Sequence, residues 1–509
     1  MTPSVHGLSP SAPPHPLDVA RERLAADIEA RVAEATAFAK NRRERATSSL
    51  PITAKVRHGE WDERWPRESD VAAVRVKGEI WTDAIQAALD TSGCVHIPAR
   101  EKPYYLDAPI ILGAGQTLTA DPGAEFRLVP GSDTCMLRNR AVVGMDQESL
   151  AIPDVPYDEG ILVEGGVWTT LLTTPEERNG NVWGHVSKAN PVHGCYGAFV
   201  FNHVRGLVVR DVVVRQCNMH GLQLSDVHDF LVDGIAFDRQ GRDGVHVHGA
   251  SDWGVIRRVS GDTKDDFIAL NAWDWSHTSP TQGPIHHILV EDSACVHAPA
   301  GDRPEGCCAI RLQPGNAPRR NGAKTLSCPV ESIVFRRIAN AKVVKMYDQP
   351  NLELGRDKDR SEPIGTMREL FFDSLCFDRP CVFEVADHVA GCDIARVRFS
   401  YDAEGSVLVR VQPKSGTWKH DPADPSTWVE IYSPDEDFTV RDFSARLFTI
   451  RRGGRDVPVD ATAFVTVADG RLNPDWPATT PRGGAGKVAF SWRGASSPSG
   501  RQTAPAMLR

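Results

Sequence analysis

Residues 241–249 read GRDGVHVHG, and residues 262–272 read DTKDDFIALNA. Related stretches lie before and after them: NMHGLQLSD at 218–226 and EGCCAIRLQPG at 305–315. The turns at Gly221, Gly244 and Asp266 follow one another at intervals of 23 and 22 residues. A near-constant period of this length is typical of a solenoid, in which every repeat forms one coil that stacks on the last.

Within each repeat, apolar and polar side chains alternate, as they do in short strands with one buried face. The alternating apolar pairs are Leu222 and Leu224, Val245 and Val247, Ile268 and Leu270, and Ile310 and Leu312. Second strands follow in GLVVRDVVV, DFLVDGIAF and WGVIRRVSG, and the β-branched content excludes a helical solenoid. The sequence therefore predicts an all-β fold, a right-handed parallel β-helix with an N-terminal helical segment and a cap.

The first part of the chain precedes the coils. Residues 1–16 are polar and proline-rich, which predicts disorder. Residues 17–79 are expected to hold a helix and a connector, with one amphipathic helix over 17–46 whose apolar face is Leu17, Leu24, Ile28 and Val32. This helix is expected to pack on the body or to contact a second copy of the chain, which makes it a candidate surface for a homo-oligomer.

The predicted β-helix domain, which would carry the catalytic site, occupies residues 80–400. A helix pattern around Ile85 and Leu89 is expected to cap its first coil, because a bare terminal coil exposes strand edges and apolar surface. Residues 401–509 are rich in strand patterns but less regular, and glycine and proline dominate from Pro474 onward. We expect last coils or a small β extension there, followed by a C-terminal tail.

Composition bears on partners and compartment. The net charge of −9 is spread along the chain, which argues against nucleic acid as a partner. No stretch is long and apolar enough to span a membrane. The polar start MTPSVHGLSPSAPPHP is not followed by the apolar region of a signal peptide, which favours a cytoplasmic location. Eleven cysteines without a small-domain spacing indicate reduced core thiols.

Three aspartates end successive repeats and are the candidate catalytic residues: Asp243, Asp265 and Asp266. Stacked coils would bring them together, since neighbouring strands lie about 4.8 Å apart. A cluster of like charges is hard to keep fully ionised, so it offers one protonated acid and one ionised base. A lone aspartate at a solenoid corner usually just satisfies backbone groups of the turn. The adjacent Asp265 and Asp266, stacked on Asp243, favour a catalytic role instead. Calcium binding is the weaker alternative, because no acidic calcium loop is present.

Aligning the inward residues Leu222, Val245, Ile268, Ile310 and Val344 places the other side chains in columns. The turn column is His220, Asp243, Asp266 and Cys308. The two outward columns are Gln223, His246, Ala269, Arg311 and Lys345, then Ser225, His248, Asn271, Gln313 and Tyr347. Imidazoles, amides and cations of this kind hold hydroxyl-rich or anionic sugars. The candidate substrate-binding residues are His220, Gln223, His246, His248, Asn271, Trp273, Trp275, Cys308, Arg311, Gln313, Lys345 and Tyr347.

Some of these residues allow a second interpretation. His246 and His248 share one face, but no third histidine or cysteine at matching geometry is evident, so we expect no metal and no cofactor. They are expected to contact sugar hydroxyls or to be surface histidines. Trp273 and Trp275 would either stack on a sugar or anchor their loop. Adjacent cysteines are poor disulfide partners, and Cys308 is expected to face the substrate.

With these residues in place, the sequence resembles the pectate-lyase-like β-helix superfamily, and most closely the polygalacturonases of glycoside hydrolase family 28. That family carries Asn-Thr-Asp-Gly, then Asp-Asp about one coil later, then Gly-His-Gly and Arg-Ile-Lys. Here GRDG matches the first motif at Asp243, and KDDFIA matches the second at Asp265 and Asp266. TDAIQAALDTSGCVHIP is similar to the cap segment of the superfamily. The family histidine aligns with Cys308 and the cation triplet with KMY at 345–347, so the resemblance implies a different glycan.

The resemblance implies a glycoside hydrolase that cleaves an oligo- or polysaccharide by an inverting three-aspartate mechanism. Asp265 would protonate the leaving oxygen, while Asp243 and Asp266 would hold and deprotonate a water on the opposite face. Arg311 would replace the cation, and His220 the imidazole, that the family has at the aligned positions and this sequence lacks. The large loop insertions favour exo action. The alternatives are a polysaccharide lyase, a cyclising glycosyl or fructosyl transferase, and a carbohydrate-binding or assembly solenoid without activity.

Overall fold

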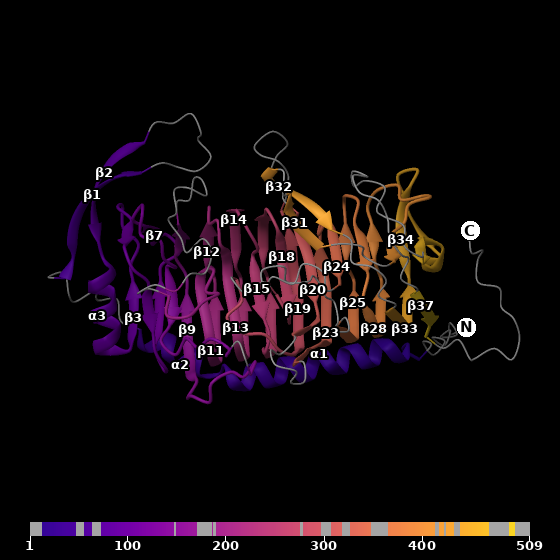
Figure 1. Cartoon of the computed structure of the whole chain (residues 1–509), viewed down its shortest axis with the longest axis horizontal. Coiled ribbons are helices and arrows are strands. Elements are labelled where there is room, and N and C mark those ends of the chain that lie inside the picture. Colours follow the sequence, from indigo (N-terminus) through magenta and orange to yellow (C-terminus); the bar gives the residue numbers. More distant parts are fainter. Residues whose placement is uncertain are drawn as a thin grey trace, which may run out of the picture.

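The structure is a computed structural model. It describes residues 13–46, 55–63, 73–146, 149–170, 186, 190–274, 278–296, 307–317, 326–347, 365–412, 417–421, 424–431, 438–467 and 488–493. Thirty-three of the described strands belong to one continuous sheet, in which successive coils lie side by side (Figure 1). Strands of neighbouring coils pair in parallel in three ladders, so the predicted parallel β-helix is confirmed.

The three ladders take their strands in chain order. The first ladder is β5 (Ile110–Leu112), β8 (Leu137–Asn139), β11 (Gly197–Arg210), β13 (His220–Asp233), β15 (Val245–His248), β18 (Asp266–Asn271), β20 (Ala309–Gln313), β24 (Val343–Met346), β27 (Val382–Val385), β30 (Val409–Val411) and β36 (Val465–Val467). The second is β3 (Cys94–Ile97), β6 (Thr117–Ala120), β9 (Asp158–Glu164), the later halves of β11 and β13, β16 (Asp252–Arg257), β19 (Ile285–Cys295), β23 (Val330–Ala339), β25 (Thr366–Asp373), β28 (His388–Ala395), β33 (Phe438–Arg446) and β37 (Val488–Trp492). The third is β2 (Val74–Ile80), β4 (Tyr104–Leu106), β7 (Glu125–Leu128), β10 (Val167–Thr169), β12 (Val213–Arg215), β14 (Ala236–Gln240), β17 (Ser260–Thr263), the ends of β19 and β23, β26 (Cys376–Phe377), β29 (Arg398–Phe399) and β34 (Phe448–Arg452).

Antiparallel pairs project from this body. They are β1 (Arg57–Glu63) with β2, β21 (Gly315–Ala317) with β22 (Leu326–Cys328), β31 (Thr417–Asp421) with β32 (Asp424–Ile431), and β34 with β35 (Arg455–Val459). A 3₁₀ helix, η4 (Ala461–Phe464), precedes β36. The described strands after residue 400 continue all three ladders, which places coils of the β-helix in this part of the chain.

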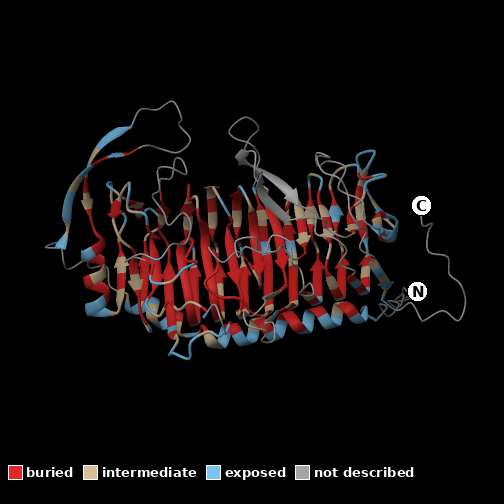
Figure 2. Ribbon diagram, in the orientation of Figure 1, coloured by how far each residue is buried: buried red, intermediate tan, exposed pale blue. Residues whose placement is uncertain are grey.

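The interior is filled by the inward side chains of the three ladders. Since successive strand residues point to opposite faces, alternate apolar residues meet in columns that run from coil to coil. Tyr104, Phe126 and Trp168 form one such column in the third ladder, with ring centroids 5.5 and 3.8 Å apart, and Phe199 of the first ladder meets Trp168 edge-on at 4.9 Å. Figure 2 shows buried residues along the whole stack. All eleven cysteines are thiols, and most are buried, as expected.

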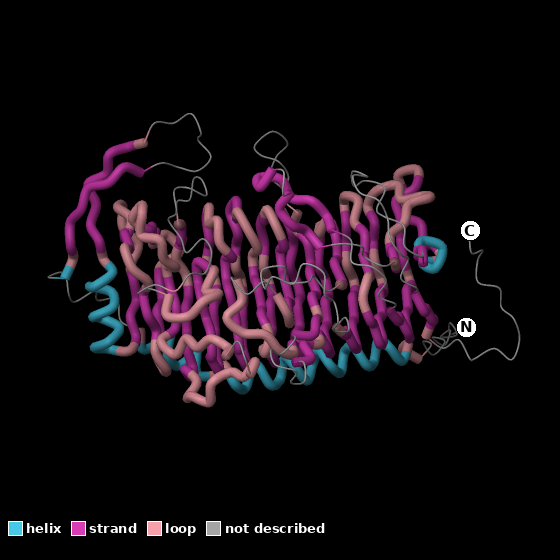
Figure 3. The backbone as a smooth tube through the Cα atoms, in the orientation of Figure 1, coloured by secondary structure: helices cyan, strands magenta, loops and turns pink. Residues whose placement is uncertain are grey.

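Helix α1 (Pro16–Ala35) lies across the outside of the second ladder and runs along the stack (Figure 3). Its apolar face is Leu17, Leu24, Ala25, Ile28 and Val32, and it packs against Val255, Leu289, Val334 and Phe371. Packing on the body is thus the role that the structure gives to this face. A second copy of the chain would have to contact the polar outer side.

The expectation of one helix over 17–46 is wrong at Thr36 and Ala37, where α1 ends. The Thr36 hydroxyl donates to the Val32 carbonyl, and a separate helix, α2 (Phe38–Arg45), follows. α2 contacts β9, where Arg43 pairs with Glu164 at 2.8 Å. The break lets the basic second helix reach this earlier coil.

Helix α3 (Thr82–Ser92) covers the N-terminal end of the coils. Ala84, Ile85, Ala88 and Leu89 belong to the main core, and Gly93 ends the helix in the left-handed conformation with φ 70°. The predicted cap around Ile85 and Leu89 is confirmed. None of the described helices is long and apolar enough to cross a membrane.

From β11 onward, each coil turns from the second ladder to the third at one left-handed residue. Asp211 has φ 53°, Gly234 φ 72° and Arg258 φ 52°. Equivalent positions are Asp292, Arg337, Ser374, Arg396 and Leu447. Aspartate and glycine adopt this conformation readily, whereas arginine and leucine pay a steric cost that the stacked coils must offset. The corners are therefore recognisable from the sequence in only some of the coils.

Candidate active site

The register of the first ladder decides which side chains meet on its outer face. Leu222 pairs with Val245, Val245 with Ile268, Ile268 with Ile310, and Ile310 with Val344. The outward neighbours follow from these pairs: Gln223, His246, Ala269, Arg311 and Lys345 in one column, and Ser225, His248, Asn271 and Gln313 in the other. The predicted order is confirmed from Gln223 to Lys345 and from Ser225 to Gln313, whereas Tyr347, the last residue of the second predicted column, follows the end of β24.

The three aspartates lie together where β15 and β18 begin. Asp243 Oδ1 accepts the backbone N–H of Asp266 at 3.3 Å, so one carboxylate is fixed against the next coil. Lys345 Nζ lies 2.7 Å from Asp266 Oδ1 and 3.9 Å from Asp265 Oδ1. Arg311 Nη1 lies 3.7 Å from Asp266 Oδ2. The acidic cluster expected from coil stacking is therefore present, and two cations from later coils contact it.

The three carboxylates differ in how far they are exposed to solvent. Asp243 and Asp266 are 5% and 3% exposed, whereas the Asp265 side chain is 42% exposed. Burial alone would raise the pKa of Asp266, but Lys345 and Arg311 outweigh it and hold that pKa below its usual value. Burial and the Asp265 carboxylate raise the pKa of Asp243 to about 6, although the hydrogen bond to His246 opposes the rise. Asp243 and Asp266 therefore differ in how strongly they hold a proton.

His246 bridges two carboxylates. Its Nδ1 lies 2.5 Å from Asp243 Oδ2, and its Nε2 lies 3.0 Å from Asp274 Oδ2. Burial lowers the pKa of His246, but the two carboxylates outweigh it and raise the pKa to about 9. Asn271 Nδ2 donates to Asp274 Oδ2 at 2.9 Å, which fixes the second carboxylate. Asn271 thus orients Asp274.

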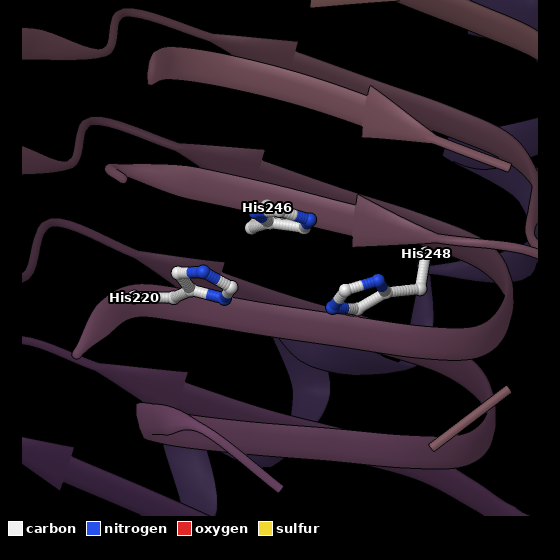
Figure 4. Close-up of side chains that lie close together, drawn as sticks. All are labelled: His220, His246 and His248. Atoms are coloured by element: carbon white, nitrogen blue, oxygen red, sulfur yellow. The ribbon is translucent and has the colours of Figure 1, made fainter. Parts of the chain in front are cut away.

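Three imidazoles lie side by side in the cluster: His220, His246 and His248 (Figure 4). The His220 and His246 rings stack with centroids 4.0 Å apart and an interplanar angle of 11°, and the His248 centroid is 4.2 Å from that of His246. One nitrogen of each ring lies within 4.8 Å of the other two. The sequence-based statement that no third histidine is available is therefore wrong, because His220 supplies it from the preceding coil.

Two amides predicted to bind sugar hold backbone segments instead. Gln223 Oε1 accepts the Tyr196 N–H at 2.6 Å, and its Nε2 donates to the carbonyls of Gly194 and Thr278 at 2.8 and 2.7 Å. Gln313 Nε2 donates to a carbonyl of the loop after β18 at 2.5 Å. Because these donors are used within the protein, we assign both amides a structural role.

The aromatic candidates have different surroundings. Trp273 packs against the core and over Gly315, where an added Cβ would lie 2.2 Å from the indole, so it anchors its loop. The Arg311 guanidinium lies 5.4 Å from the centroid of the Tyr347 ring. Tyr347 therefore helps to hold a cation of the acidic cluster. Trp275 lies outside the described residues.

The adjacent cysteines are placed opposite to expectation. Cys308 is fully buried in the main core, so its predicted contact with substrate is wrong. Cys307 is partly exposed, and its sulfur lies within 4.8 Å of oxygens of Asp265 and Asp266. A register shift between Asp266 and Ile268, together with left-handed backbone at Cys308 (φ 43°), exchanges the two positions.

Sequence reasoning missed two charged residues of this site. Asp274 lies between the two tryptophans of NAWDW, and Arg242 directly precedes Asp243 in GRDG. Arg242 Nη1 is 3.8 Å from Asp265 Oδ2. Both residues flank predicted site residues, so proximity in the chain was the available signal.

No family model matches the chain, and no curated protein matches it. Among solved structures, a surface adhesin of Streptococcus pneumoniae is 11% identical with a TM-score of 0.41, over 73% of this chain and 85% of the adhesin. A family 28 exopolygalacturonase of Yersinia enterocolitica is 10% identical with a TM-score of 0.38, over 83% and 81%. The A-module of a mannuronan C-5 epimerase of Azotobacter vinelandii is 12% identical with a TM-score of 0.37, over 76% and 96%. These likenesses concern the course of the backbone, and the three proteins differ in what they do.

Proposed function

We propose that the chain is a carbohydrate-active enzyme that hydrolyses a glycosidic bond of an oligo- or polysaccharide, with inversion at the anomeric carbon. The observation that carries this proposal is the cluster of three aspartates from successive coils, with their unequal exposure. Asp265 is the general acid that protonates the leaving oxygen. Asp243 and Asp266 hold the water and take its proton.

The unequal exposure supports this division of roles. A general acid must touch the glycosidic oxygen of a bound glycan, and the half-exposed Asp265 is accessible for that contact. Asp243 and Asp266 are buried and fixed by a backbone N–H, His246 and Lys345. Carboxylates held in this way keep a water in one orientation, which lowers the cost of reaching the transition state.

Lys345 favours hydrolysis over elimination. A lyase on this scaffold would use lysine or arginine as its base, and that base must first be deprotonated. Burial lowers the pKa of Lys345, but Asp266 at 2.7 Å outweighs it, with help from other neighbours, and raises the pKa well above its usual value. Lys345 therefore stays protonated and serves to neutralise Asp266.

The burial of this face supports exo action. His246, His248 and Gln313, all on the outer side of the first ladder, are 2%, 0% and 1% exposed. The carbonyls of Gly194 and Thr278 accept hydrogen bonds from Gln223 of the same ladder, so their segments lie against this outer side. A site enclosed on one side admits the end of a sugar chain more easily than its middle.

The test is a panel of oligosaccharides of defined linkage, incubated with the wild type and with Asp265→Asn. Loss of a general acid is expected to lower kcat by about 10²–10⁴-fold on any substrate that the wild type cleaves. Asp238→Asn is the matched control, because its side chain is 40% exposed and it lies in the third ladder. Circular dichroism checks that both variants are folded. A wild type that releases no new reducing ends, or an Asp265→Asn variant as active as Asp238→Asn, contradicts the proposal.

A further inference from the structure

We propose that His220, His246, His248 and Asp274 bind one divalent transition-metal ion of the Zn²⁺ class. The inference goes beyond glycoside hydrolysis and stands whether or not the chain cleaves a glycan. Imidazole nitrogen is a preferred ligand of Zn²⁺, and three imidazoles with one further ligand form a common zinc site.

The arrangement of the three rings is the first observation. His220 begins β13, and His246 and His248 stand two residues apart on the same face of β15. In Figure 4 the rings of His220 and His248 extend toward each other from opposite sides, and His246 lies above the gap between them. One nitrogen of each lies within 4.8 Å of the others, and binding one ion at about 2.0–2.1 Å requires the stacked rings of His220 and His246 to rotate until their nitrogens converge.

The hydrogen bonding of His248 is the second observation. His248 is 0% exposed, and its Nδ1 has no hydrogen-bond partner among the described residues. The Gln223 amide has two hydrogens, both of which go to backbone carbonyls, so it has none left for His248 Nε2. His248 Nε2 lies 3.2 Å from the Gln223 amide nitrogen, which also contacts the Thr278 carbonyl, so the described polar neighbours of this ring lie on its Nε2 side. Among the described residues nothing satisfies Nδ1, and a buried polar atom in that state is costly unless a ligand binds it.

The surroundings of His246 match those of a metal-bound histidine. Such a histidine usually donates its second ring N–H to a carboxylate, which fixes its tautomer and orientation. His246 Nδ1 makes this contact with Asp243 at 2.5 Å, which turns Nε2 toward Asp274. Nε2 lies 3.0 Å from Asp274 Oδ2, and Oδ2 is also 3.9 Å from His248 Nδ1. The carboxylate is thus placed to share an ion with both rings.

The type of ion follows from the ligands. Calcium and magnesium prefer oxygen ligands, whereas imidazole selects zinc and the neighbouring transition metals. A second group, Asp265, Asp266 and Cys307, also has its ligand atoms within 4.8 Å of one another. A cation is disfavoured there, because the ammonium of Lys345 already lies 2.7 Å from Asp266.

The test uses the full chain without a histidine tag, freed of metal by dialysis against a chelator. Zn²⁺ bound per chain is measured by elemental analysis after gel filtration, and Co²⁺ is added as a spectroscopic probe. We expect about one ion per chain and visible Co²⁺ absorption from nitrogen ligation. His248→Gln is expected to weaken the affinity at least tenfold, since loss even of an outer partner costs about 10–100-fold.

His203→Gln is the matched control, because His203 is 1% exposed and hydrogen-bonded to Asp226 rather than to the cluster. It is expected to bind metal like the wild type. His220→Gln provides a second test of the site if His248→Gln does not fold. The proposal is overturned if the wild type retains no Zn²⁺ and gives no Co²⁺ spectrum, or if the cluster variants bind as tightly as His203→Gln. These measurements need no glycan, so they separate this inference from the hydrolase.

Discussion

At the scale of single residues, the pair of buried Asp266 and largely buried Lys345 holds the acidic cluster together. Asp266 is 3% exposed, and its carboxylate has lost the water that would stabilise its charge. The ammonium of Lys345 at 2.7 Å replaces part of that hydration. Removing one member of such a pair lowers the free energy of unfolding by more than the intact pair contributes to it, because the other charge stays buried without a partner.

Lys345→Met is expected to lower the free energy of unfolding by about 3 kcal/mol for this reason. Combining it with Asp266→Asn should restore part of the loss, because no uncompensated charge then remains. Urea unfolding of both single variants and the double variant measures the coupling. Lys77→Met is the control, because Lys77 pairs with Glu60 at the surface and its side chain is 80% exposed. If the loss of unfolding free energy in the double variant equals the sum of the losses in the two single variants, the two charges do not interact.

A second residue-scale prediction concerns pH. Burial lowers the pKa of His228, but Asp226 and Asp252 outweigh it and raise the pKa to about 9. A raised pKa stabilises the fold below the unfolded value of 6.5, and this contribution disappears as pH rises through 9. The shift corresponds to about 3 kcal/mol at most. Between pH 6 and about 10, the thermal unfolding temperature should therefore fall more steeply for the wild type than for His228→Gln. Parallel pH profiles would refute this role for His228.

At the scale of elements, α1 ties distant coils together. Asp18, near its start, pairs with Arg446 of β33 at 2.7 Å, and Arg31, near its end, pairs with Asp229 of β13 at 2.7 Å. Between them its apolar face lies on the second ladder. Solenoid coils otherwise contact only their neighbours, so a helix across many coils adds long-range contacts that such folds usually lack.

Ile28→Ala in α1 is expected to lower the free energy of unfolding by about 2–5 kcal/mol, because Ile28 is fully buried against the second ladder. Val19→Ala in the same helix is the control. Val19 is 52% exposed, so its loss should change stability by less than about 0.5 kcal/mol. Denaturant unfolding of the two variants gives the comparison. Equal losses would mean that the packing of α1 adds little to stability.

At the scale of the whole molecule, the stacking was predictable where repeat length and alternation coincide. Residues 218–272 contain both signals, so the register from Leu222 to Ile268 and the meeting of the three aspartates followed from the sequence. The cap by α3 followed from its amphipathic pattern. Later coils have unequal lengths and corners such as Arg337 and Leu447, which no corner preference identifies.

The rest of the site depends on contacts that no repeat encodes. Asp274 enters the cluster from a loop, and the ring contacts of His220 depend on side-chain rotation rather than on strand register. Cys307 and Cys308 exchange places because of one register shift. Periodicity specifies columns of residues, whereas loops and bulges decide which side chains finally meet.

The most direct test of the central claim is the configuration of the sugar first released by the wild type. Proton NMR in the first minutes of the reaction distinguishes the two anomers before they equilibrate. Water held by Asp243 and Asp266 opposite Asp265 predicts the anomer inverted with respect to the cleaved bond. A product with retained configuration, or an unsaturated sugar formed without uptake of water, would contradict it.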